Sequence, residues 1–121
     1  MRQAHSIDEL TRKRPDFEVE DAVFWYGDDF QGGITWVGRY SGASPWERHP
    51  GDEYLYVVDG SVRVILLADG GREEMVLEKG SFCVVPANTW HKQIADTSVF
   101  QIGATPGETE HSELADPRDP G

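Results

Sequence analysis

Between Val19 and Thr105 the chain is a succession of short runs of β-branched and aromatic residues, interrupted by glycine or other turn residues. The longest apolar run, Val64 to Ala68, has only five residues, so it can form neither a transmembrane helix nor a signal-peptide core. Short runs at even spacing are typical of an antiparallel sandwich or barrel. We therefore predict an all-β fold with strands at 20–27, 33–41, 53–58, 61–68, 72–78, 81–85, 89–95 and 98–104.

Local signals divide the rest of the chain. Asp59-Gly60 predicts a two-residue hairpin turn, which needs positive φ. Ser6-Ile7-Asp8-Glu9 has the form of a capping box and predicts a short helix from Ile7 to Arg14 that ends at Pro15. The segment after Thr105 has no periodicity, so we expect it to be disordered or to lie over the barrel surface. We predict one domain, with a helix and lead-in at 1–19, a β-barrel at 20–104 and an irregular acidic tail at 105–121.

The charge balance excludes some partners. With 11 Lys and Arg against 22 Asp and Glu, the net charge is −11. Such a chain lacks the basic surface that grips nucleic-acid backbones, and an anionic membrane would repel it. A single cysteine, Cys83, cannot form an internal disulfide, which fits a reducing compartment. We expect a cytoplasmic protein that binds neither nucleic acid nor membranes.

Four residues carry the candidate chemistry: Glu47, His49, Glu53 and His91. Side chains two apart on a strand share a face, so Glu47 and His49 point the same way. Glu53 has the same parity, after a Pro50-Gly51 bend. If the strands wrap into a barrel, all four can converge on its interior. Imidazole and carboxylate groups suit a divalent transition metal.

The two segments that contain these residues resemble the motifs of the cupin superfamily. The His49–Glu53 separation is four residues and Glu53–Gly60 is seven, and in the second segment Gly80–Pro86 is six and Pro86–His91 is five. The resemblance covers residues 42 to 95 and starts at Gly42. It implies a single jelly-roll barrel, or double-stranded β-helix, with a metal and a small-molecule pocket in its interior.

The chain departs from the family pattern at three positions. Glu47 stands where the family has its first histidine, Asn88 replaces a glycine, and Ala95 replaces a closing asparagine. Asn88 is a mild change because Asn tolerates left-handed backbone. Glu47 changes the chemistry. As a ligand it would formally neutralise a divalent ion; as a free group beside a His49–Glu53–His91 facial triad it would be a candidate base.

These observations favour a mononuclear metal-dependent enzyme acting on a small organic substrate. The reaction would be an Fe(II)-dependent oxidation by O₂, or a metal-assisted isomerisation, cyclisation or lyase step. We expect one divalent ion, Fe(II) or Mn(II) ahead of Zn, Ni or Cu. The alternatives are a cupin that senses a metal or metabolite without turnover, and an inert barrel. In the inert barrel His49, Glu53 and His91 would be a polar core cluster. For Glu47, the plain alternatives to metal ligation are a salt bridge to Arg48 or an exposed position at the mouth.

Other conspicuous residues have plainer interpretations. We expect His5 and His111 to be solvated and Cys83 to be a small strand residue rather than a nucleophile. Four aromatic residues are expected mostly in the core, with one or two walling a pocket: Trp36, Tyr40, Phe82 and Trp90.

Strand parity makes a further prediction. If Glu53 faces the interior, Leu55 and Val57 face it too, while Tyr54 and Tyr56 face outward. Outward tyrosines need cover, which we expect from the N-terminal strands or from a second subunit. A homodimer is therefore expected.

Overall fold

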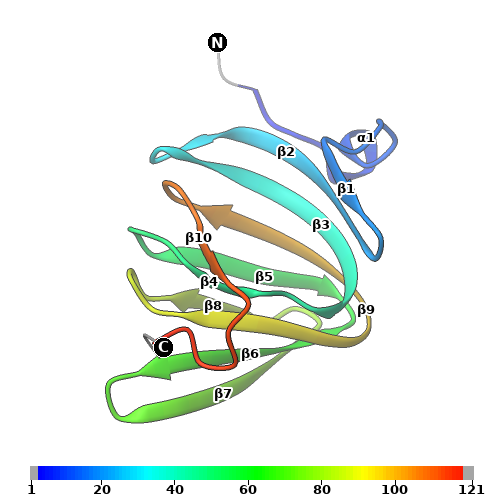
Figure 1. Cartoon of the computed structure of the whole chain (residues 1–121). Coiled ribbons are helices and arrows are strands. Elements are labelled where there is room, and N and C mark those ends of the chain that lie inside the picture. The colour runs from blue at the N-terminus through cyan, green and yellow to red at the C-terminus, as the bar shows by residue number, and fades with distance from the viewer. Residues whose placement is uncertain (1–2, 119–121) are drawn as a thin grey trace.

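The structure, a computed structural model, describes residues 3–118 and is built almost entirely of antiparallel strands. Figure 1 shows them curling around a common interior. In chain order the elements are α1 (Ile7–Leu10), β1 (Phe17–Val19), β2 (Ala22–Phe30), β3 (Gly33–Ala43), β4 (Trp46–Arg48), β5 (Glu53–Asp59), β6 (Ser61–Ala68), β7 (Gly71–Glu78), β8 (Phe82–Val85), β9 (His91–Thr105) and β10 (Glu110–Ser112). The predicted all-β jelly-roll fold with a short N-terminal helix is confirmed.

The long strand β9 organises the sheet. The main path runs β1-β2-β3-β9-β4-β10, and β9 also pairs with β5 and β6, which carry β8 and β7. Its first half pairs with β6 and its second half with β5. A register shift opposite β3, between Tyr40 and Gly42, falls where two separate strands were expected. Residues 96–98 therefore form an irregularity within one strand rather than a turn.

The interior is filled from alternate strand positions. On β5, Leu55 and Val57 are fully buried, whereas Tyr54 on the opposite face is 38% exposed and Tyr56 is half-buried. The predicted register of this strand is confirmed. The described N-terminal strands do not bury Tyr54, which was expected to be covered.

Two predicted turns have the backbone that their residues require. Gly60 joins β5 to β6 with the predicted positive φ, +83°. The predicted hairpin itself is wrong, because β5 and β6 do not pair with each other; both pair with β9 instead. Asn88 has φ +57°, the left-handed conformation that this residue type tolerates. The substitution of Asn for glycine is thus accommodated locally.

The chain ends differ from expectation. The helix stops at Leu10 rather than Arg14, after an N-terminus capped by the Ser6 hydroxyl. It buries no residue, so no packed apolar face extends it. The tail is not irregular throughout, since Glu110–Ser112 forms β10 along the edge of β4. This corrects the expectation for these three residues, where free β4 edge groups provide backbone partners. None of the helices in residues 3–118 is long and apolar enough to cross a membrane.

Candidate metal centre

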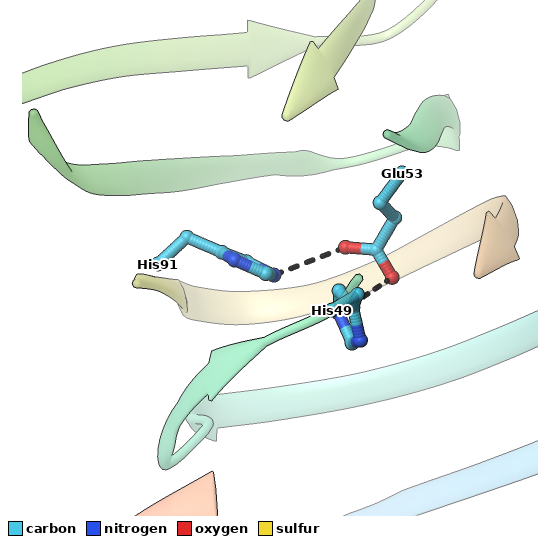
Figure 2. Close-up of side chains that lie close together, drawn as sticks. All are labelled: His49, Glu53 and His91. Carbon is cyan, nitrogen blue, oxygen red and sulfur yellow. Dashed lines mark hydrogen bonds and ion pairs between the residues drawn. The ribbon is translucent and has the colours of Figure 1, made fainter. Parts of the chain in front are cut away.

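Three of the four candidate residues meet in the interior. His49 follows β4, Glu53 begins β5 and His91 begins β9 (Figure 2). Their nitrogen and carboxylate ligand atoms all lie within 4.8 Å of one another, and all three side chains are buried. Glu53 Oε1 lies 3.0 Å from His91 Nε2, and Glu53 Oε2 lies 3.3 Å from His49 Nε2. This group has the composition and spacing to hold a metal ion.

Backbone contacts fix how the two histidine-bearing segments meet. The Asn88 N–H donates to the His49 carbonyl at 2.8 Å, and the Ala87 N–H donates to the Asp52 carboxylate at 2.8 Å. The turn that precedes His91 is therefore tied directly to the loop between His49 and Glu53. Asn88 makes this contact in its left-handed conformation, φ +57°.

The contacts of His91 define which of its nitrogens faces the carboxylate and which one carries a hydrogen. Its Nδ1 lies 3.0 Å from the Thr89 carbonyl, which can only accept, so Nδ1 carries a hydrogen. Nε2 then faces the Glu53 carboxylate either as part of an imidazolium or with a bare lone pair. Burial alone would lower the pKa of His91, but the hydrogen bond and charge of Glu53 outweigh burial and raise it. A cation between Nε2 and the carboxylate would replace that proton.

His49 has an unused ligand atom. Its Nδ1 lies 3.0 Å from the Thr109 hydroxyl. Its buried Nε2, although 3.3 Å from Glu53 Oε2, makes no hydrogen bond of acceptable geometry to a described residue. A buried nitrogen without a partner is costly in a protein interior. A metal ion would satisfy it, so the donor set fits a divalent metal.

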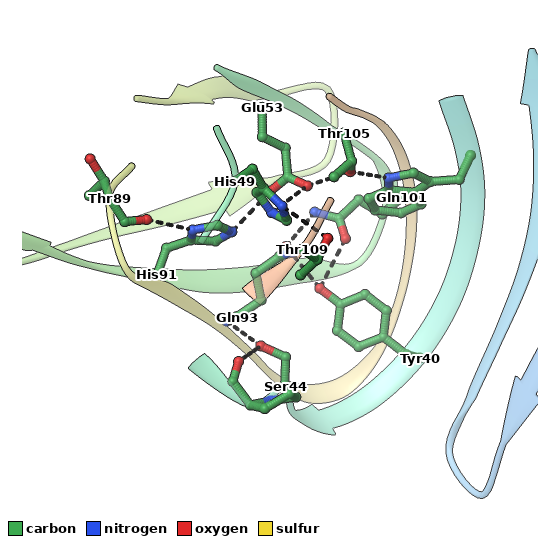
Figure 3. Close-up of polar contacts among 12 residues, drawn as sticks. Tyr40, Ser44, His49, Glu53, Thr89, His91, Gln93, Gln101, Thr105 and Thr109 are labelled. Carbon is green, nitrogen blue, oxygen red and sulfur yellow. Dashed lines mark hydrogen bonds and ion pairs between the residues drawn. The ribbon is translucent and has the colours of Figure 1, made fainter. Parts of the chain in front are cut away.

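Glu53 is held by a chain of donors (Figure 3). The Trp36 indole N–H donates to the Thr105 hydroxyl at 2.8 Å. That hydroxyl donates to Glu53 Oε2, and Figure 3 shows these two side chains facing each other. Burial would raise the pKa of Glu53, but its close contacts with the imidazoles of His49 and His91 lower it to about 2. The carboxylate is therefore ionised and oriented before any ion binds.

Glu47 lies beside this group but is not part of it. It stands opposite His91 across β4 and β9, and opposite His111 across β4 and β10. Directly opposed residues share a sheet face, so all three face the interior side. Burial, followed by the charge of Glu53, raises the pKa of Glu47. The alternative of an ion pair with Arg48 is not seen, because Arg48 pairs with Glu110 at 2.7 Å.

A cavity of about 600 Å³ adjoins the site and is bordered by both Glu47 and Glu53. Its other walls come from β1, β2, β3, β9 and the tail, and include Trp36 and Tyr40. Both aromatic residues are buried, as expected, whereas Phe82 is 61% exposed, so its expected core position is wrong. Phe82 lies opposite Tyr56 on the outward face of β5 and β8.

Sequence reasoning missed several residues of the site. His111 was expected to be solvated; it is exposed but borders the cavity. Thr105 at the end of β9 contacts Glu53, and Thr109, between β9 and β10, contacts His49. A lone threonine in an aperiodic segment carries no signal that would identify such contacts. Cys83 is a half-buried strand residue, and burial followed by the charge of Glu53 raises its pKa to about 11, which disfavours a nucleophilic thiolate.

The curled antiparallel sheet with an interior His/Glu/His group defines a metal-binding type of β-barrel. Comparison with known proteins gives the family: a model described as the cupin domain matches residues 39–101, about half of the chain. The protein belongs to the cupin family.

Among curated proteins, the chain is similar to acireductone dioxygenases of two Rhodopseudomonas palustris strains. Each is 39% identical over 46 residues, which is 38% of this chain and 28% of the relative. The matched part therefore spans less than a third of these relatives.

Solved structures share the fold. The oxalate decarboxylase of Bacillus subtilis superimposes with a TM-score of 0.68 and 18% identity, over 84% of this chain and 30% of that one. The Lactobacillus farciminis oxalate decarboxylase gives a TM-score of 0.69 and 16% identity, over 84% and 34%. A hydroquinone 1,2-dioxygenase in complex with Cd²⁺ and 4-hydroxybenzonitrile gives 0.57 and 24%, over 67% and 61%.

Proposed function

We propose that this cupin is a mononuclear enzyme that depends on a divalent metal and acts on a small organic substrate. The observation that carries the proposal is the buried His49–Glu53–His91 group, with ligand atoms within 4.8 Å of one another, beside a cavity of about 600 Å³. Two imidazoles and one carboxylate form the facial triad that suits non-haem Fe(II) and leaves coordination positions open. Such an ion supplies Lewis acidity and the redox chemistry that O₂ requires.

The chain's own residues would orient the ligands and move a proton. The Thr89 carbonyl and the Thr109 hydroxyl fix the two imidazole rings through their Nδ1 atoms, and Thr105 fixes Glu53. Such supporting contacts set ring orientation and ligand basicity. Glu47 borders both the site and the cavity, and we assign it the role of base that accepts a proton from the substrate.

The named relatives support an oxidation by O₂. The curated relatives are acireductone dioxygenases, and one structural neighbour is a hydroquinone 1,2-dioxygenase. We therefore place an Fe(II)-dependent dioxygenase reaction ahead of an isomerase, cyclase or lyase step, with Fe(II) or Mn(II) as the ion.

Metal content followed by oxygen uptake tests the proposal. Untagged protein should contain about one divalent ion per chain, and the Fe(II)-reconstituted protein should consume O₂ with an organic substrate. Metal-free protein under these conditions would contradict the metal site. A full metal complement without O₂ uptake or substrate conversion would identify a binding module instead of an enzyme.

We also propose a cytoplasmic homodimer. Cys83 is a free thiol, which suits a reducing compartment. The outward face of β5 and β8 is apolar and unusually exposed, with Tyr54 at 38%, Phe82 at 61% and Val84 at 50%. Burial of such a face against a second copy would remove apolar area from water.

A further inference from the structure

The cavity beside the metal centre has an unusual charge distribution. Four carboxylates border it, and no Lys or Arg is among its described lining residues. The four are Glu20, Asp21, Glu47 and Glu53. Of the remaining lining residues only His111 can become cationic. An anionic ligand would thus find no charge-assisted donor fork or ammonium group.

A bound ion would not reverse this balance. A divalent cation beside Glu47 and Glu53 gives a formal charge of zero, and Glu20 and Asp21 add negative charge at the exposed rim. The net charge of −11 over the whole chain further disfavours the approach of anions. A carboxylate ligand is disfavoured both on entry and once bound.

One wall of the cavity is aromatic. The Phe24 ring lies 5.5 Å from Trp36 in an edge arrangement and 6.3 Å from Tyr40 in a stacked one. Phe17 continues the wall, with its ring 6.1 Å from that of Phe24, and is itself 47% exposed. Aromatic clusters of this kind pack favourably against a further ring.

One polar group on the wall is free to bind a neutral oxygen. Gln93 Oε1 accepts from the Tyr40 hydroxyl at 2.9 Å and from Gln101 Nε2 at 2.6 Å, as Figure 3 shows. The Tyr40 hydroxyl also lies 2.9 Å from Gln101 Oε1 and, with one hydrogen, donates to only one of the two amides. The end of the Gln93 amide that lies away from this network makes no hydrogen bond to a described residue, and Gln93 borders the cavity. Gln93 thus offers a neutral amide group to a ligand in the cavity.

We infer that the cavity binds an uncharged aromatic alcohol, a phenol or hydroxymethyl arene, and excludes carboxylates. The ring packs on the Phe24–Trp36–Tyr40 wall and the hydroxyl group forms a hydrogen bond with the Gln93 amide. The inference rests on the proposed function only in naming the substrate class of the same site, since binding itself requires no turnover.

Three probes on one ring separate charge from shape: 4-(hydroxymethyl)phenol, 4-hydroxybenzylamine and 4-hydroxybenzoate. In calorimetric titration of metal-loaded protein, the neutral probe should bind most tightly. It should bind at least about 10-fold more tightly than the carboxylate probe, because the described lining offers the carboxylate no cationic hydrogen-bond donor. Equal or tighter binding of 4-hydroxybenzoate would overturn the inference. Preference for the amine would overturn it in favour of a cationic substrate.

Two matched variants test the physical basis. Asp21→Lys, at the cavity rim, should tighten 4-hydroxybenzoate about 3- to 10-fold, while Glu18→Lys on the same hairpin, which does not border the cavity, should leave it unchanged. Gln93→Met should weaken the neutral probe about 3- to 10-fold through one lost hydrogen bond. Unchanged affinities in folded Asp21→Lys and Gln93→Met proteins would contradict the inference.

The proposed function fails by different measurements. Purified protein without metal, or metal-loaded protein that binds the neutral probe but converts no substrate, would contradict the enzyme proposal and leave the inferred ligand class intact. Normal metal content with turnover of a carboxylate substrate would support the enzyme proposal and contradict the inferred ligand class.

Discussion

At the scale of single residues, the proton and the metal compete for the same atoms. Glu53 and its hydrogen bond raise the pKa of His91 above 6.5 against the effect of burial, so the folded protein binds this proton more tightly than the unfolded chain does. That contribution to stability is present below about pH 6.5 and is lost as pH rises through the raised pKa. Burial opposes ionisation of Glu53, but its histidine contacts lower its pKa from 4.5 to about 2, so its contribution is lost as pH falls towards 2.

The metal should therefore stabilise the protein more as pH rises. An ion that replaces the His91 proton needs a neutral imidazole, so the metal-induced increase in Tm should be larger at about pH 8 than at about pH 6. Binding should weaken further below about pH 6. Scanning calorimetry with and without Mn²⁺ across this range measures the difference. An increase in Tm that is independent of pH would contradict the assignment of His91 as a ligand.

Removal of the imidazoles should remove the metal. The His49→Ala/His91→Ala double variant keeps only Glu53 of the triad, and so few protein ligands rarely hold a first-row metal tightly. We expect less than about a tenth of the wild-type metal content by mass spectrometry. The control is His5→Ala, which removes an imidazole that contacts Asp28 outside the candidate metal centre, and this variant should keep its metal. Stoichiometric metal in the double variant would place the ion elsewhere.

Substitution of Glu47 separates its two possible roles. As a base, Glu47→Gln should leave metal affinity unchanged and reduce turnover by about 10²- to 10⁴-fold. As a ligand, the same change should weaken metal binding by about 10- to 100-fold. Glu47→His should then keep the metal, because imidazole can occupy the same position. Metal titration and steady-state kinetics on one preparation decide between the roles.

At the scale of elements, the long strand β9 joins the core to the site. Gly103 lies opposite Trp36 on β3, and a Cβ there would overlap the Trp36 indole. The same indole donates to Thr105, which holds Glu53. The absence of a side chain at one position of β9 thus permits a contact chain that ends at a candidate ligand.

Gly103→Ala should accordingly affect both stability and metal binding. Overpacking against the indole should destabilise the fold by about 1–3 kcal/mol, and displacement of Trp36 should weaken metal affinity by about 10-fold. Gly70→Ala is the matched control, since its Cβ would meet nothing within 4 Å. Urea denaturation and metal titration measure the two effects. A Gly103→Ala protein with unchanged stability would show that Trp36 is free to move.

At the scale of the whole molecule, the outward face of β5 and β8 exposes large apolar side chains to solvent. Phe82 packs beside Tyr54, with ring centroids 5.5 Å apart, yet both are exposed. If a second copy covers this face, sedimentation at about tens of micromolar protein should show a dimer, because a stable interface has a dissociation constant below this concentration. Phe82→Lys should then shift the protein to monomer, while Val76→Lys, at a similarly exposed position on β7, should not. A wild-type monomer at this concentration would contradict the homodimer.

The sequence by itself determined the fold class and the identity of the His49–Glu53–His91 group. Strand alternation, turn residues and short-range spacing are local properties, and they are sufficient to place Leu55 inside and Tyr54 outside. The end of the helix and the continuity of β9 were not predictable, because both depend on which neighbours supply packing and backbone partners.

Only the tertiary structure decided what surrounds that group. Thr105 and Thr109 meet Glu53 and His49 across 52 and 60 residues of chain, and Gln93 meets Tyr40 across 53. The lack of cationic residues around the cavity likewise emerges only when β1, β2, β3 and the tail close around it. Such contacts arise from the closure of the barrel, which brings together residues whose local sequences carry no common pattern.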